Sequence, residues 1–113
     1  MITEQQMREI LAQYAKHGWS LRRVLLSAET GENLSDALFG QAEIFLSEVN
    51  ALWFSRTSLE GREAWEIRHL SNTPFALVAV FEAEDKETVR EQVRQELQTR
   101  LVEQASKAGR QNP

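Results

Sequence analysis

Three runs of sequence decide the fold: residues 49–57 (VNALWFSRT), 62–71 (REAWEIRHLS) and 75–83 (FALVAVFEA). Each run is apolar or alternates between apolar and polar residues, a pattern that favours β-strands. The connecting residues 58–61 (SLEG) and 72–74 (NTP) are typical of chain reversals. The central part of the chain is therefore predicted to form a three-stranded antiparallel meander.

The length of the first reversal sets the register of the meander. A loop at residues 58–61 places Thr57 opposite Arg62, so that apolar residues meet apolar residues and opposite charges meet on one face. The third strand adds Ala76, Val78 and Val80 to this face, and a helix is expected to cover it because a small sheet needs such cover. The predicted pairs are Leu52 with Ile67, Phe54 with Trp65, Arg56 with Glu63 and Asn50 with His69.

A helix is predicted near each end of the chain. Residues 4–17 follow a capping box that begins at Thr3, carry apolar side chains at helical spacing, and precede Gly18, which can end the helix. Residues 86–107 carry an apolar residue at every fourth position from Val89 to Leu101 and pairs of opposite charges elsewhere. This narrow apolar stripe indicates a long helix lying on the sheet.

The segment between the first helix and the meander is harder to assign. Residues 21–27 favour a strand, residues 29–41 form an irregular acidic segment with one possible helical turn, and residues 42–46 suggest a short edge strand. The predicted class is α+β: N-terminal helix, strand, irregular acidic segment, three-strand antiparallel meander and long C-terminal helix packed on the sheet. The prediction is one domain over residues 1–108 and a frayed tail over residues 109–113.

Composition narrows the classes of function. The 113 residues are 42% hydrophobic and 27% charged, which is typical of one globular domain. The absence of cysteine excludes disulfides, thiolate catalysis and thiolate metal ligands. A net charge of −4 argues against binding to nucleic acid, and the acidity is concentrated in residues 29–48, which hold five acids and no base. Neither a secretory signal nor a membrane span is seen, so a soluble cytoplasmic protein without a membrane partner is predicted.

The sequence motifs predict no catalytic residue, metal site or cofactor. The five glycines are scattered, so no phosphate-binding loop is indicated, and neither histidine stands in a metal-binding motif. One small-ligand or enzymatic pocket stays open as an alternative, because the predicted register gathers polar groups beside an aromatic wall. A hydrogen-bonded residue at the rim of the hairpin is the stronger interpretation of the histidine. The residues of this candidate pocket are Tyr14, Asn50, Glu63 and His69.

The second face of the meander is also apolar, although Glu66 and Arg68 interrupt it. Either an element of the same chain covers this face or another chain does. The favoured hypothesis is a non-catalytic protein-interaction or oligomerisation domain that forms a twofold homodimer, in which Glu66 and Arg68 pair across the axis. The C-terminal helix would supply a second contact. The residues expected at the interface are Trp53, Glu66, Arg68, Phe75, Leu77 and Phe81.

Overall fold

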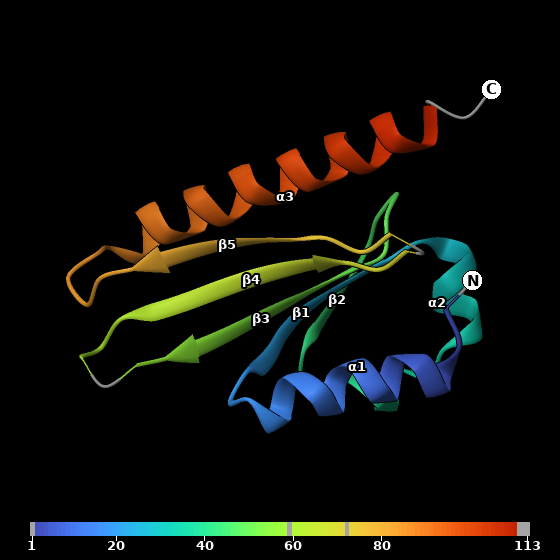
Figure 1. Ribbon diagram of the computed structural model, residues 1–113, viewed down its shortest axis with the longest axis horizontal. Helices are drawn as coiled ribbons and strands as arrows, with labels where there is room; N and C mark the ends of the chain where they lie inside the picture. Colours follow the sequence, from blue (N-terminus) through green and yellow to red (C-terminus); the bar gives the residue numbers. More distant parts are fainter. Residues whose placement is uncertain (1, 59, 72, 111–113) are drawn as a thin grey trace.

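The predicted meander is present, and two further strands extend it into a five-stranded sheet (Figure 1). The computed structural model describes residues 2–58, 60–71 and 73–110. Along the chain the elements are α1 (Glu4–Lys16), β1 (Ser20–Leu26), α2 (Ala28–Asn33), the short 3₁₀ helix η1 (Asp36–Phe39), β2 (Glu43–Leu46), β3 (Ala51–Thr57), β4 (Glu63–His69), β5 (Ala76–Phe81) and α3 (Glu87–Arg110). The predicted α+β class, with a long C-terminal helix packed on the sheet, is confirmed.

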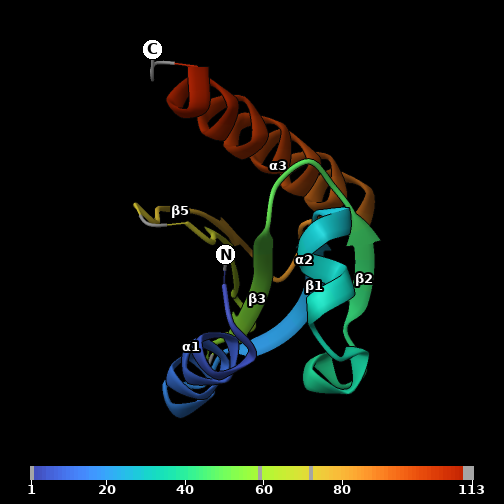
Figure 2. The same cartoon turned by 90° about the vertical axis from the view of Figure 1, so that its right-hand side faces the viewer.

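The strand order is β2-β1-β3-β4-β5. Strands β1 and β2 run parallel, and every other pair of neighbours runs antiparallel. Figure 2 shows β2 and β5 at the two edges of the sheet, while Figure 1 shows α1 and α3 on opposite faces. The sheet is therefore mixed, with helical cover on both sides.

Local signals set the limits of α1 as predicted. The Thr3 side chain accepts a hydrogen bond from the backbone N–H of Gln6 at 3.1 Å, and the Gln6 side chain accepts one from the backbone of Thr3 at 2.9 Å. Gly18, with φ of 85°, follows the helix in a conformation that favours glycine. At the other end of the chain, α3 continues to Arg110, beyond the predicted end at residue 107. Residues 111–113 of the predicted tail lie outside the described residues.

The acidic segment is more regular than predicted. Residues 28–33 form α2, which Ser27 caps by accepting a hydrogen bond from the backbone N–H of Thr30. Helices α2 and η1 bury Leu34 and Phe39 against the sheet and then deliver the chain to β2. The two short helices supply the crossover that the parallel pairing of β1 and β2 requires. The predicted edge strand is confirmed as β2.

The predicted register of the first hairpin is wrong by one residue. Thr57 pairs with Glu63 and not with Arg62, because the loop has five residues and closes through a hydrogen bond from the Ser58 backbone N–H to the Arg62 carbonyl at 2.8 Å. Gly61, at φ of 78°, provides the extra left-handed residue. A shift of one residue moves side chains to the opposite face. The observed pairs include Leu52 with Arg68, Trp53 with Ile67, Phe54 with Glu66 and Ser55 with Trp65.

The corrected register divides the apolar residues into two cores. Toward α1, α2 and η1 the buried residues are Met7, Val24, Leu26, Leu34, Phe39, Leu52, Phe54 and Leu70. Toward α3 they are Leu25, Ala51, Trp53, Trp65, Ile67, Phe81, Leu97 and Leu101. The Trp53 indole N–H donates to the Gln98 side chain at 3.0 Å, which ties the second core to α3. Helix α3 is thus the internal cover of that face.

Within the described residues, no helix is long and apolar enough to cross a membrane.

Candidate functional site

Strand β5 is covered on only one of its faces. Phe81 is buried beneath α3, whereas Val78 and Val80 on the opposite face are 52% and 61% exposed. Helix α1 lies on that opposite face, but its aromatic contact is with β3, where the Tyr14 and Phe54 rings stack with centroids 3.8 Å apart. The valines of β5 therefore form an uncovered apolar strip at the edge of the sheet.

Half of the backbone polar groups of β5 point away from β4. The backbone N–H of His69 donates to the Phe75 carbonyl at 2.9 Å, so Phe75 directs its polar groups toward β4. In an antiparallel ladder these directions alternate along the strand. The N–H and C=O groups of Ala76, Val78 and Val80 consequently point away from the sheet. We call these three residues the open edge.

A groove of about 670 Å³ lies between α1 and the neighbouring ends of β3, β4 and β5. Arg68 and Asn50 line it together with Ile10 of α1 and Pro74, which precedes β5. Near the groove, the Tyr14 hydroxyl donates to Glu66, and the Arg68 guanidinium lies 5.7 Å from the Tyr14 ring centroid. Burial, followed by the hydrogen bond to Glu66, raises the pKa of Tyr14 to about 12.

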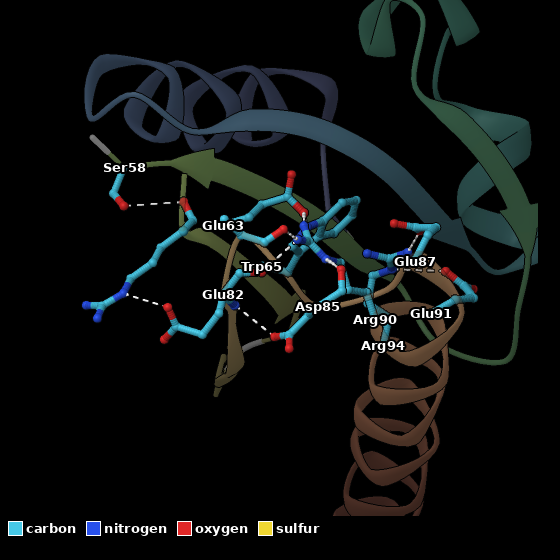
Figure 3. A network of polar contacts seen from close by, with 11 residues as sticks. Ser58, Glu63, Trp65, Glu82, Asp85, Glu87, Arg90, Glu91 and Arg94 are labelled. Atoms are coloured by element: carbon cyan, nitrogen blue, oxygen red, sulfur yellow. Dashed lines mark hydrogen bonds and ion pairs between the residues drawn. The ribbon is translucent and has the colours of Figure 1, made fainter. Parts of the chain in front are cut away.

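On the other side of the sheet, a network of arginines and glutamates surrounds Trp65 (Figure 3). The Arg94 side chain is only 2% exposed, and its guanidinium carbon lies 4.4 Å from the Trp65 ring centroid, a cation–π contact. A β-bulge at Arg22 interrupts the pairing of β1 with β3. The guanidinium carbons of Arg22 and Arg23 lie 5.5 and 5.6 Å from the same centroid.

Carboxylates neutralise most of these arginines. Arg94 donates to Glu87 and, at 2.9 Å, to Glu91, while Arg23 donates to both carboxylate oxygens of Glu91 at 2.6 and 3.3 Å. Hydrogen bonding from Arg23 lowers the pKa of Glu91 to about 2. A cleft of about 630 Å³ adjoins this network, but paired charges offer an anionic ligand little free attraction. The network fastens α3 to β1 and β4.

The structure does not bring the four predicted pocket residues together. Glu63 and His69 lie at opposite ends of β4, and Tyr14 lies on the other face of the sheet. Glu63 accepts hydrogen bonds from the Trp65 indole and from Arg90, the latter at 3.2 Å. The Asn50 side chain accepts the backbone N–H of Ser27 at 2.8 Å. Tyr14, Asn50 and Glu63 therefore each have a separate hydrogen-bond partner within the structure.

His69 is a half-buried residue packed at the end of the hairpin. Its ring lies 5.0 Å, centroid to centroid, from that of Phe75, and its Nδ1 has no hydrogen-bond partner among the described residues. Burial lowers the pKa of His69, so the neutral imidazole is favoured. No group of three or more potential metal ligands occurs in the described part of the chain.

The six residues expected at an interface fall on both faces of the sheet. Trp53 is completely buried and Phe81 almost so, while Phe75 and Leu77 pack at the border of the same core under α3. The shifted register places Glu66 and Arg68 on the α1 side instead. The exposed valines of β5, Val78 and Val80, lie on the α1 side, away from the core that contains Trp53 and Phe81.

Two important features were missed in the sequence. The uncharged run of residues 75–81 lacks the charges and proline that normally protect an edge strand, so only the strand order shows that it forms an edge. The pairs of opposite charges in residues 86–107 predict an exposed Arg94 beside Glu91, yet the spacing of Arg94 from Leu97 and Leu101 places it on the buried face of α3. Comparison with protein-family models, with curated proteins and with solved structures finds no match for this chain.

Proposed function

We propose that this protein is a non-catalytic protein-interaction domain that binds an extended, uncharged polypeptide segment along β5. The observation that carries the proposal is the coincidence of free backbone groups and exposed side chains on the same three residues, Ala76, Val78 and Val80. An added strand would form hydrogen bonds with these backbone groups and pack against these side chains. Main-chain pairing of this kind is a recurring mode of peptide recognition.

The charge pattern defines the chemistry of the partner. No charged side chain occurs in residues 75–81, and proteins normally protect exposed edges with charges, proline or bulges. Glu82, just beyond the strand, is paired with Arg62 at 2.9 Å. An apolar, β-branched segment therefore meets no repulsive charge along β5, whereas a charged segment would lose hydration without gaining an ion pair.

A synthetic peptide with residues 74–83 of this chain, flanked by lysines for solubility, tests the proposal directly. We expect the peptide to bind and to slow amide exchange at the open edge. The control peptide carries N-methyl groups on the amides that pair with β5 and is expected not to bind. Equal binding of both peptides, or no binding of either, contradicts strand addition.

A substitution in the protein, rather than in the peptide, tests the same backbone contact. Val78→Pro removes an N–H that points outward, so the hydrogen bonds between β4 and β5 are kept. Losing one hydrogen bond should weaken binding of the peptide by roughly 2- to 10-fold. Val89→Lys, at a 49% exposed valine on α3, is the control and should bind as the unaltered protein does.

A further inference from the structure

We infer that the segment bound along β5 is β5 of a second copy of this chain, which makes the protein a twofold homodimer with its axis at Val78. The inference rests on the proposed function and names its partner. In this arrangement two five-stranded sheets join into one continuous ten-stranded sheet. The α1 helices lie on one face and the α3 helices on the other, because an axis perpendicular to the sheet preserves its faces.

The alternation of backbone directions limits the possible registers, and the register centred on Val78 pairs all three residues of the open edge with one another. A residue whose backbone N–H and C=O groups point outward must lie opposite another such residue. An even-numbered position of one copy therefore lies opposite an even-numbered position of the other. Centring the contact on Val78 places Val78 opposite Val78 of the partner subunit and Ala76 opposite Val80 of the partner subunit. Every residue of the open edge then exchanges two hydrogen bonds, and the exposed valines pack across the axis.

The second edge of the sheet is less suited to self-association. Strand β2 exposes Leu46 to 80%, but it has four residues and belongs to the acidic segment 29–48. Twofold pairing through β2 would bring Glu43 and Glu48 of the two copies toward one another, and like charges across strands are destabilising. Pairing β2 of one copy with β5 of the next would not close and would produce filaments.

The oligomeric state of the full chain separates these arrangements. Sedimentation equilibrium should show a species of twice the 13.0 kDa chain mass at protein concentrations below about 100 μM. Val78→Lys should dissociate it, whereas Val89→Lys and Leu46→Lys should leave the dimer intact, with unchanged circular dichroism in all three. A monomer at every concentration, filaments, or dissociation by Leu46→Lys would overturn the inference. If the monomeric chain still binds the peptide, the proposed function survives.

Single cysteines report the register, because the chain has no cysteine of its own. Directly opposite residues with outward groups have Cα atoms about 5.5 Å apart, within the range that a disulfide can bridge. Val78→Cys should therefore form a disulfide-linked dimer on mild oxidation. Val80→Cys should not, since the two positions would be separated by four residues along neighbouring strands, about 13 Å. Efficient linkage through position 80 instead would refute the register centred on Val78.

The backbone contact is tested separately with Val78→Pro in the full chain. On the twofold axis this substitution removes two hydrogen bonds at once, one from each copy. The dissociation constant should rise roughly tenfold to a hundredfold. An unchanged dissociation constant would show that the copies associate without pairing their β5 strands.

Discussion

The two faces of β5 are both apolar, but only one is part of a core. Phe81 is 4% exposed beneath α3, whereas Val80, the neighbouring residue, is 61% exposed on the other face. The difference comes from the helices: α3 has 24 residues and packs along β4 and β5, while α1 has 13 and packs over β1 and β3. A continuous run of apolar residues thus shows that a strand can be buried on both faces, but the lengths and positions of the helices decide which faces are buried.

The largest expected effect tests whether the α3 face is internal. Trp53→Ala should lower the free energy of unfolding by about 3–5 kcal/mol, because a completely buried ring and its hydrogen bond to Gln98 are lost. Val80→Ala on the opposite face should lower it by less than about 1 kcal/mol. Urea unfolding at a protein concentration where the chain is monomeric measures both. Equal losses would mean that the two faces are not distinguished by burial.

The next prediction concerns the charges that hold α3 to the sheet. Arg94→Met should destabilise the protein by about 1–3 kcal/mol, since hydrogen bonds to Glu87 and Glu91 and the contact with Trp65 are lost. Arg100→Met, at an exposed position of the same helix, should change the free energy of unfolding by less than about 0.5 kcal/mol. If Arg94→Met lowers the free energy of unfolding no more than Arg100→Met does, apolar packing alone holds α3 against the sheet.

A smaller effect is expected on the α1 side. Tyr14→Phe keeps the stacking on Phe54 but loses the hydrogen bond to Glu66, and should cost about 1 kcal/mol at neutral pH. Chemical denaturation measures this loss. A cost near zero would show that Glu66 finds an equally good partner in water.

The pH dependence of Tyr14 follows from its raised pKa. Folding favours the neutral phenol, so this contribution to stability is complete below pH 10 and is lost as the pH rises toward 12. Because the chain has one tyrosine, the absorbance of tyrosinate reports this residue alone. A folded-state midpoint at or below 10 would contradict the buried hydrogen bond.

The sequence predicts well what short-range signals determine. The capping box at Thr3, the glycine after α1 and the spacing of Val93, Leu97 and Leu101 in α3 all depend on neighbours within one or two turns. Val89, the first residue of the predicted apolar stripe, is 49% exposed. The one-residue error in register arose because a loop of four and a loop of five residues both give plausible pairs, and the left-handed conformation of Gly61 favours the longer loop.

The candidate site was less predictable because it depends on long-range arrangement. The burial of Arg94 depends on the packing of α3 against Trp65 of β4, and the bulge at Arg22 depends on how β1 pairs with β3. Likewise, the uncharged run in β5 indicates an edge only once the strand order is known. The sequence contains these residues but does not show which residues of other strands and helices lie beside them.

Amide exchange at two adjacent residues of β5 tests the central claim most directly. The N–H of Ala79 points toward β4 and should exchange slowly at any protein concentration, whereas that of Val78 points outward. We expect the Val78 amide to exchange rapidly in dilute protein and to become protected as the concentration rises and dimers form. Rapid exchange of Val78 at concentrations where the protein is fully associated would contradict pairing through the open edge.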